Sequence, residues 1–249
     1  MKNFFKKLEL LSKYFFSIQN VGLFNYLYLR KEGINIFRYQ LFNKQWIKEL
    51  NIRSIIDIGA NIGEMTKIFD LIFKKPSIFM FEPLEVCRDN LQALSNKSDN
   101  IKFFPYALGN SDEKKTIFKS SWVPSSSLLE MTDEHKKLYP HSSGSAKENI
   151  HIKPLDQSID HSKLIDNLMI KVDVQGYEKE VIAGGREVFT KAKLIIIELS
   201  YLELYEGEPG FHDIYTELLN LGFTFKGALK QSENPDDGSY IQIDAIFIK

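Results

Sequence analysis

Residues Ser54–Gly63 read S-I-I-D-I-G-A-N-I-G, and the next apolar run, Ser77–Phe81, is followed by Glu82 in M-F-E-P. An apolar run that turns through glycines into a helical pattern predicts a buried strand leading into a helix. Glu82 then lies at the end of the neighbouring strand, where its carboxylate can accept hydrogen bonds from both hydroxyls of a ribose. The stretch predicts an α/β sheet with a nucleoside site at the strand ends.

The glycine loop has its own spacing, D-x-G-x-x-x-G, whereas a pyrophosphate-binding dinucleotide loop prefers G-x-G-x-x-G. Gly59 and Gly63 let the backbone approach a ligand closely, because they carry no Cβ atom. Asp57 adds a negative charge that repels a pyrophosphate but attracts an ammonium and a sulfonium. These features favour S-adenosylmethionine as the ligand. Taken alone, the loop also fits an α/β protein that uses its glycines only for a tight turn.

Composition limits the class of protein. The chain has 249 residues, of which 43% are hydrophobic, so it can bury a sizeable core, and a doubly wound sheet of this length need not be divided. The net charge of −1 offers no general attraction to nucleic acid, which we do not expect as a partner. Cys87 is the only cysteine, so no intramolecular disulfide and no thiolate metal cluster can form. A reducing, cytoplasmic location fits this usage.

Residues 1–50 are predicted to form a helical extension or lid, and residues 51–249 the main domain. We expect neither a transmembrane segment nor a signal peptide. Near the N-terminus, apolar residues recur at helical spacing among lysines and predict an amphipathic helix: Phe4, Leu8, Leu11, Phe15 and Ile18. Such a helix packs on the domain or on a second subunit, giving a homo-oligomer; weak contact with a membrane surface is the alternative. Residues 20–50 read as further helical material that covers one face of the sheet or contributes to a substrate lid.

After the first strand, apolar strands and helical patterns alternate, which predicts a mostly parallel sheet. The strands are expected at 54–58, 77–81, 101–104, 168–172 and 193–199, with a short one at 116–118. Residues 223–225 and 241–248 predict a terminal hairpin at the sheet edge, which makes the last strand antiparallel. Residues 120–149 are rich in Ser, His and Lys and predict a long irregular excursion over the site.

Several ordered segments resemble the FkbM-type methyltransferases: I-I-D-I-G-A-N-I-G-E-M-T, F-M-F-E-P, F-F-P-Y-A-L-G-N, S-S-S-L, I-K-P-L-D, I-K-V-D-V-Q-G-Y-E-K-E-V-I-A-G-G and I-I-I-E-L. The resemblance covers about residues 52–248. It implies a class I methyltransferase (Rossmann-like) fold and S-adenosylmethionine-dependent O-methylation of hydroxyl groups, often on sugars, glycolipids or secondary metabolites. Gln175 stands where many relatives have Glu in D-x-E-G, so a mechanism that needs a carboxylate there is in doubt.

Transferred by position, the resemblance also implies a set of cofactor-binding residues. The methionine portion is expected near Asp57, Gly59, Ala60, Asn61 and Gly63, the ribose on Glu82, and the adenine beside Ala107 and Leu108. A short apolar pair after the third strand can sandwich a purine, although it is equally typical of a strand-to-loop junction. Ser126, in the serine-rich element, is expected to contact the cofactor's carboxylate or the acceptor, unless these serines only form turns.

Methyl transfer to an aliphatic hydroxyl benefits from a base within hydrogen-bond reach. Asp173 is our first candidate, because it follows a strand at the edge where open α/β sheets place their ligands. Glu198, near the end of the neighbouring strand, is the second and His135 the third. Structural alternatives are a helix cap for Asp173 and a loop anchor for Glu198. The histidine spacing predicts no metal site, although Asp173 and Glu198 could recruit a divalent cation.

Three functions follow from these patterns. The first is an O-methyltransferase acting on a hydroxyl of a sugar, glycan or glycan precursor, with S-adenosylmethionine as cofactor. The second is a nicotinamide-dependent oxidoreductase, in which a strand-end acid such as Glu82 also binds a ribose; the missing G-x-G-x-x-G opposes it. The third is a non-catalytic domain that binds a nucleoside for regulation or assembly.

Overall fold

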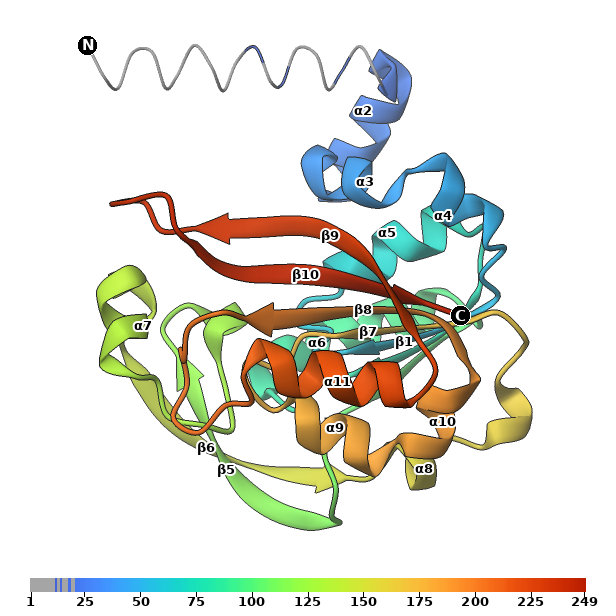
Figure 1. Cartoon of the computed structure of the whole chain (residues 1–249). Coiled ribbons are helices and arrows are strands. Elements are labelled where there is room, and N and C mark those ends of the chain that lie inside the picture. The colour runs from blue at the N-terminus through green and yellow to red at the C-terminus, as the bar shows by residue number, and fades with distance from the viewer. Residues whose placement is uncertain (1–11, 13, 15–17, 19–20) are drawn as a thin grey trace.

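A computed structural model describes residues 12, 14, 18 and 21–249 of the chain. Within that part, seven strands form the central sheet in the order β3-β2-β1-β7-β8-β10-β9 (Figure 1). These strands are β1 (Ser54–Ile58), β2 (Ser77–Phe81), β3 (Ile101–Phe104), β7 (Leu168–Val172), β8 (Ala192–Ser200), β9 (Thr224–Glu233) and β10 (Tyr240–Ile248). Neighbouring strands pair in parallel from β3 through β2, β1 and β7 to β8. Strand β10 is antiparallel to both β8 and β9. The predicted mostly parallel sheet with an antiparallel last strand is confirmed.

Helices cover both faces of this sheet. One face packs against α3 (Ile36–Phe42), α5 (Glu64–Ile72) and α6 (Glu85–Lys97). The other packs against α9 (Glu178–Gly184), α10 (Arg186–Lys191) and α11 (Phe211–Asn220). Every residue of β1 and of β7 is buried, as expected for central parallel strands covered on both faces. Because β1 and β7 are adjacent and parallel, the β1-to-α5 and β7-to-α9 turns lie at the same edge of the sheet.

The terminal hairpin is longer than the sequence predicts. Its first strand extends from Thr224 to Glu233, whereas the sequence predicts only residues 223–225. The remainder of β9 is mostly exposed and polar, so hydrophobic patterning did not reveal it. Its pairing with β10, which is buried along most of its length, defines it as a strand.

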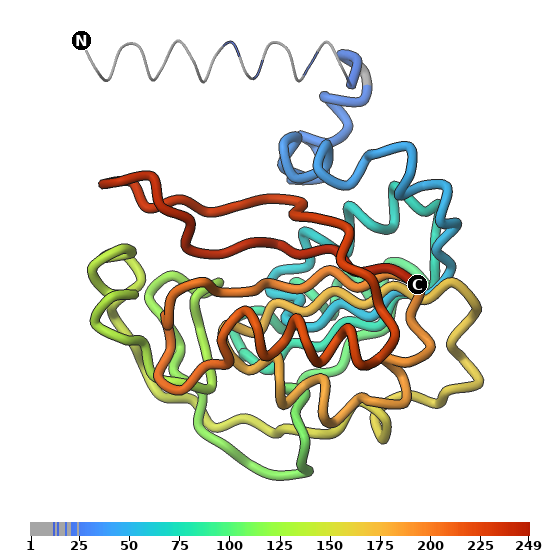
Figure 2. Tube along the Cα trace, in the orientation of Figure 1, coloured from blue at the N-terminus to red at the C-terminus, as the bar shows by residue number. Residues whose placement is uncertain are grey.

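The prediction of an irregular excursion over residues 120–149 is wrong in part. A second sheet has the order β4-β6-β5, from β4 (Ala107–Leu108), β5 (Glu113–Ser120) and β6 (Ser145–Lys153). Between β5 and β6 lie α7 (Asp133–Leu138) and two short 3-10 turns, η1 (Val123–Ser125) and η2 (Pro140–Ser142). Only Ile150 and Ile152 of β6 are buried, so the strand has little apolar signal and depends on its pairing with β5. In Figure 2 this segment extends away from the central sheet as a green to yellow tube.

The described part of the N-terminal segment is helical, with α2 (Leu23–Lys31) and α4 (Gln45–Glu49) on either side of α3. Phe42 packs edge-on against Phe69 of α5, with ring centroids 5.2 Å apart, which attaches the segment to the sheet's helical layer. Of the predicted amphipathic helix, Phe4, Leu8, Leu11 and Phe15 lie outside the described residues. No helix in the described ranges has both the length and the apolar character needed to cross a bilayer.

Candidate active site

A cavity opens at the carboxyl ends of β1, β2 and β7, beside the second sheet. We call it the Glu82 cavity. It is lined by Ile58, Gly59, Asn61, Phe81, Glu82, Pro83, Leu84, Ala107, Leu108, Ile117, Val123, Pro124, Ser126, Leu128, Asp173, Val174, Gln175 and Tyr177. Open α/β sheets bind their ligands at this edge. Most of the wall is apolar, with a few polar groups, as is usual for a small-molecule site.

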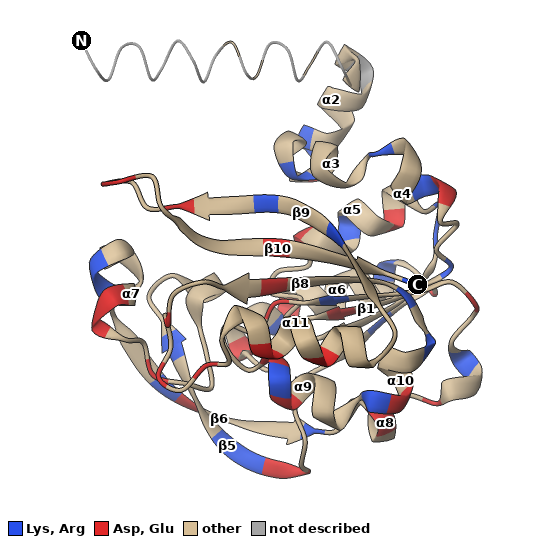
Figure 3. Cartoon of the chain, viewed as in Figure 1, with Lys and Arg blue, Asp and Glu red and all other residues tan. Residues whose placement is uncertain are grey.

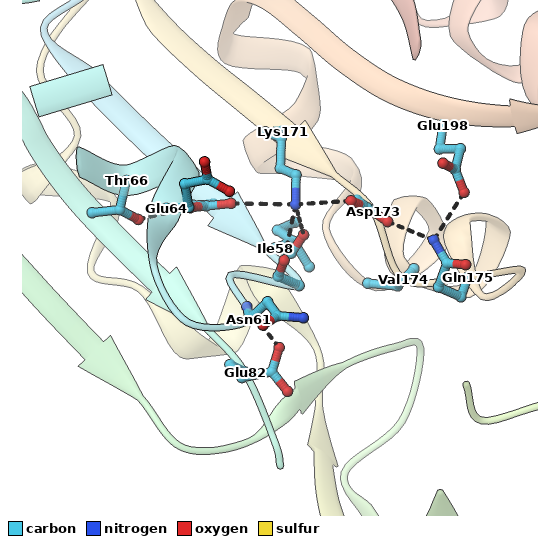
Figure 4. Close-up of polar contacts among 12 residues, drawn as sticks. Ile58, Asn61, Glu64, Thr66, Glu82, Lys171, Asp173, Val174, Gln175 and Glu198 are labelled. Carbon is cyan, nitrogen blue, oxygen red and sulfur yellow. Dashed lines mark hydrogen bonds and ion pairs between the residues drawn. The ribbon is translucent and has the colours of Figure 1, made fainter. Parts of the chain in front are cut away.

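Glu82 is the buried carboxylate of this wall, with 6% of its surface exposed. One oxygen accepts a hydrogen bond from the Asn61 backbone N–H at 2.9 Å (Figure 4). The other accepts from the Leu84 N–H at 3.0 Å. Burial raises the pKa of Glu82 to about 7, although both hydrogen bonds and the Lys171 cation oppose the shift. Each oxygen keeps lone pairs for further donors, so the carboxylate can accept from a vicinal diol.

The two glycines of the β1-to-α5 loop lie very close to other parts of the chain. Gly59 has φ +72°, and a Cβ atom on it would lie 1.9 Å from the Asp173 carbonyl oxygen. Gly63 has φ +79°, and its Cβ would lie 2.3 Å from the Leu94 side chain. The sequence interpretation attributed both glycines to the approach of a ligand. The structure gives them another reason, because here they allow β7 and α6 to pack against the loop.

Three residues predicted for the methionine portion do not line the Glu82 cavity. Ala60 is buried, Gly63 faces α6, and Asp57 is fully buried in β1. Asp57 accepts a hydrogen bond from the Thr66 hydroxyl at 2.7 Å, and its other oxygen lies 3.5 Å from the Lys171 ammonium. Burial raises the pKa of Asp57, and Lys171 opposes this. The charge of Asp57 therefore lies beneath the β1-to-α5 loop, inside the protein, and not on the wall of the Glu82 cavity.

Lys171 is not among the residues predicted from the sequence, and it connects the ends of β1 and β7. Its ammonium donates to the Gly59 carbonyl at 2.9 Å and lies 3.4 Å from an Asp173 carboxylate oxygen (Figure 4). Burial alone would lower the pKa of Lys171, but Asp173 and Asp57 outweigh it, so the pKa is raised and the ammonium stays charged. A lysine inside the otherwise apolar strand L-M-I-K-V was the available signal, because buried lysines require partners.

Asp173 and Glu198 meet through Gln175. The Gln175 amide nitrogen donates to Asp173 at 2.7 Å and to Glu198 at 2.9 Å (Figure 4), and its oxygen accepts from the Tyr205 hydroxyl at 2.9 Å. The pKa of Glu198 is raised by burial and by the nearby Asp173 charge. The amide therefore holds two acids together that would otherwise repel each other, and a carboxylate at position 175 could not donate to either.

Part of the wall of the Glu82 cavity is apolar. Ala107 and Leu108, both buried in β4, line it together with Val123 and Pro124 of η1. This wall contains the pair predicted to contact a purine. Ser126 also lines the cavity, but its hydroxyl oxygen already accepts a hydrogen bond from the Ser120 N–H at 3.0 Å. The segment after β5 therefore does lie over the site, as the sequence predicted.

His135, the third candidate base, is not brought to the Glu82 cavity. It lies in α7 with 2% of its surface exposed, and its Nε2 lies 3.1 Å from the Ser142 hydroxyl. Its ring packs edge-on against Tyr205, with centroids 4.9 Å apart. Burial lowers the pKa of His135 to about 4, so the ring is neutral near pH 7. Among the described residues, no group of three or more His, Cys, Asp or Glu side chains is placed to hold a metal ion.

Comparison with known proteins places the chain in a family. The sequence model of the methyltransferase FkbM domain matches residues 57–225, which include Glu82, Asp173 and Glu198. The chain belongs to the FkbM methyltransferase family. The match includes both the β1-to-α5 loop and the loop after β7, which approach each other at Gly59 in this chain.

Two curated relatives match part of the chain. The 2-O-methyltransferase NoeI of Sinorhizobium fredii (strain NBRC 101917 / NGR234) is 32% identical over 168 residues, or 62% of this chain and 66% of NoeI. The methyltransferase sdnD of Sordaria araneosa is 27% identical over 162 residues, or 53% of this chain and 60% of sdnD. The chain thus spans slightly less than two thirds of the length of each.

The fold of the FkbM family is also found in a solved structure. The methyltransferase FkbM from Methylobacillus flagellatus KT superposes with a TM-score of 0.50 at 16% identity, over 84% of this chain and 48% of that one. At this identity the likeness concerns the fold alone. It supports the class I methyltransferase fold that the strand order already shows.

Proposed function

We propose that the protein is an S-adenosylmethionine-dependent O-methyltransferase that acts on a hydroxyl of a sugar, glycan or glycan precursor. The observation that carries this proposal is the buried Glu82 carboxylate at the end of β2, facing a largely apolar cavity that Asp173 borders on its other side. Family membership supports the methyltransferase reaction, and the name of the relative NoeI, a 2-O-methyltransferase, supports oxygen as the acceptor atom.

The Glu82 cavity suits the chemistry of this cofactor. Glu82 would accept hydrogen bonds from the ribose hydroxyls, while Ala107, Leu108 and Val123 would contact the adenine. The cation Lys171 is turned away into the interior between Asp57 and Asp173, so the polar residues left on the cavity wall are acidic or neutral. Such a wall tolerates a positively charged ligand better than a pyrophosphate. We therefore favour S-adenosylmethionine over a nicotinamide dinucleotide.

S-adenosylmethionine supplies an electrophilic methyl group on a sulfonium. The chain's own contribution is to orient the acceptor hydroxyl and to take its proton as the new bond to carbon forms. Asp173 is the proposed base, because it lies on the cavity wall and is oriented by Lys171 and Gln175. Glu198 receives the amides of Gln175 and Gln242, so we assign it to holding Gln175 in place.

Calorimetry and mass spectrometry test this proposal together. Titration with S-adenosylmethionine should release or absorb heat that saturates, whereas NAD should give none. Incubation with S-adenosylmethionine and a panel of sugars and nucleotide sugars should then yield a product heavier by one methylene unit. Heat from NAD alone would overturn the cofactor assignment. S-adenosylmethionine binding without turnover across the panel, and without a methyl difference in glycans of cells lacking the gene, would favour a non-catalytic domain.

A further inference from the structure

Helix α3 and the α9 to α11 layer cover opposite faces of the central sheet (Figure 1). A second cavity lies on the α3 face. We call it the Asp244 cavity. It is lined by Asn35, Phe37, Arg38, Leu41, Phe42, Met65, Lys171, Val172, Asp173, Ile196, Glu198, Lys230 and Asp244. Asp173 lines this cavity and the Glu82 cavity, so one carboxylate borders both.

Strand register places a row of charged side chains across the floor of the Asp244 cavity. Glu198 of β8 lies opposite Asp244 of β10, and Asp244 lies opposite Lys230 of β9. Directly opposed residues of antiparallel strands project on the same face, so the three side chains are neighbours. Figure 3 shows this alignment as a blue band on β9 next to red bands on β10 and β8.

In the described part of the chain, two side chains of this row make neither a hydrogen bond nor an ion pair. Among the described residues, Asp244 accepts no hydrogen bond and neither Asp244 nor Lys230 forms an ion pair, whereas Arg38 is paired with Glu64 at 2.6 Å. Burial and the nearby Asp173 raise the pKa of Asp244 to about 6, against the effect of Lys230. Asp244 is thus mostly ionised at pH 7. A half-buried carboxylate that faces a cavity without a donor is suited to a ligand's hydroxyl groups.

The opposite wall of the Asp244 cavity is apolar. Phe37 and Leu41 come from α3, and Met65 comes from the first turn of α5. Glu64 holds these two helices together, because it accepts hydrogen bonds from the Asn35 N–H at 3.0 Å and from the Arg38 guanidinium. A saccharide has both surfaces that such a cavity complements: hydroxyls for carboxylate and ammonium groups, and a C–H face for apolar side chains.

We propose that the Asp244 cavity is the acceptor site and that it binds a neutral saccharide, with Asp244 and Lys230 contacting its hydroxyls and Phe37, Leu41 and Met65 contacting its C–H face. The proposal rests on the proposed function, since Asp173, which borders both cavities, would then lie beside the acceptor hydroxyl at the point where that hydroxyl meets the methyl donor. The wall offers no surplus of positive charge to an anionic sugar, because its three cations, Arg38, Lys171 and Lys230, are matched by three acids, Asp173, Glu198 and Asp244. The α3 segment, residues 36–42, accordingly contributes to acceptor specificity.

Methionine methyl NMR tests the location directly. With [13C-methyl]methionine in the protein, Met65 reports on the Asp244 cavity, and Met131 reports on a separate hollow beside Tyr205. Met80 and Met169 are fully buried and serve as internal controls. We expect the methyl glycosides of glucose, mannose or galactose, with S-adenosylhomocysteine present, to shift the Met65 resonance alone. A shift at Met131 in its place, or none at Met65 with any of the three, would overturn the site, and a response only to methyl glucuronide would overturn the neutral class.

Matched variants test the row of charges. Asp244→Asn and Lys230→Met should each weaken the binding of the responding glycoside about tenfold, as expected for the loss of one charge-assisted hydrogen bond. Lys226→Met is the control, because Lys226 is also exposed on β9 but lies outside the cavity wall. Equal affinities for all three variants and the unmodified protein would overturn the role of the row.

Calorimetry with S-adenosylmethionine on the same samples separates the proposed acceptor site from the proposed methyltransferase function. Asp244→Asn should bind S-adenosylmethionine like the unmodified protein, which also shows that the variant is folded. Absence of S-adenosylmethionine binding in the unmodified protein would contradict the proposed function. Normal binding of S-adenosylmethionine combined with a silent Met65 resonance would contradict only the acceptor site.

Discussion

We propose that Glu82 provides the specific polar recognition of the cofactor. Its two oxygens are held by the Asn61 and Leu84 N–H groups, so the carboxylate is oriented before any ligand arrives. We predict that Glu82→Ala weakens S-adenosylmethionine binding by about 2 kcal/mol, because it removes charge-assisted hydrogen bonds. Calorimetry measures this directly. Glu85→Ala, which changes an exposed residue at the start of α6, is the control, and an unchanged affinity in Glu82→Ala would remove Glu82 from the ribose site.

The raised pKa of Glu82 has a consequence for binding. With a pKa of about 7 in the ligand-free protein, the carboxyl group is largely protonated at pH 6 and largely ionised at pH 8. Ribose hydroxyls donate to the ionised form, so binding should favour that form. We predict that S-adenosylmethionine affinity falls as the pH is lowered through 7. Glu82→Gln should flatten this dependence, and the same pH profile in the variant would assign the titration to another group.

We propose that Asp173 takes the proton of the acceptor hydroxyl and contributes little to cofactor binding. We predict that Asp173→Asn lowers turnover by at least about 100-fold, the usual contribution of a general base, while the S-adenosylmethionine affinity stays within a few-fold. Single-turnover methyl transfer separates these two quantities. Glu203→Gln, a change at an acid outside both cavities, should leave the rate unchanged. Full activity in Asp173→Asn would exclude it as the base.

At the level of elements, the β1-to-α5 loop and the loop after β7 depend on Gly59. A Cβ atom there would lie 1.9 Å from the Asp173 carbonyl oxygen, and the φ of +72° strains any other residue. We predict that Gly59→Ala lowers the free energy of unfolding by about 3 kcal/mol or more and also disturbs cofactor binding. Urea denaturation measures the first effect and calorimetry the second.

Gly207→Ala is the matched control for this substitution. Gly207 has nearly the same φ, +74°, but its Cβ would meet no atom within 4 Å. It should therefore show only the backbone strain, about 1 kcal/mol. Equal losses for the two variants would show that the contact between the loops contributes nothing beyond conformational preference.

For the whole molecule, buried acids with raised pKa values should make stability depend on pH. The pKa is about 7 for Glu82, about 8 for Glu178 and about 7 for Glu208, in each case raised chiefly by burial. Between the ordinary value of 4.5 and these values the folded state binds more protons than the unfolded state, so stability falls as the pH rises. His135, with its pKa lowered to about 4, acts in the opposite direction only below about pH 6.5.

We therefore predict that the ligand-free protein is less stable at pH 8 than at pH 6.5. The midpoint of urea denaturation at the two pH values measures this. Glu178→Gln should reduce the difference, since Glu178 is buried and its carboxyl accepts from the Val174 N–H at 3.2 Å. A midpoint that rises from pH 6.5 to pH 8 would contradict the raised pKa values.

The central strands and the Glu82 position could be read from the sequence because their signals are local. An apolar run, a glycine turn and a strand-end acid lie within about 30 residues of one another. The first two are required by the strand-to-helix packing, and the acid belongs to the ligand site at the end of the strand. The β5–β6 ribbon and most of β9 could not be read in this way. They are polar, exposed strands whose existence depends on a partner strand, and no local pattern describes that partner.

By itself, then, the sequence determined the class I sheet, its glycine loop and the acid at the end of β2, because neighbouring residues impose these features. Only the tertiary structure decided that Asp57 faces the interior, that Lys171 connects it to Asp173, and that His135 lies away from the cavity. It also decided that Lys230, Asp244 and Glu198 form one row beneath α3. The physical reason is that burial and strand register bring together residues far apart in the chain, and the charge and pKa of each side chain depend on those neighbours.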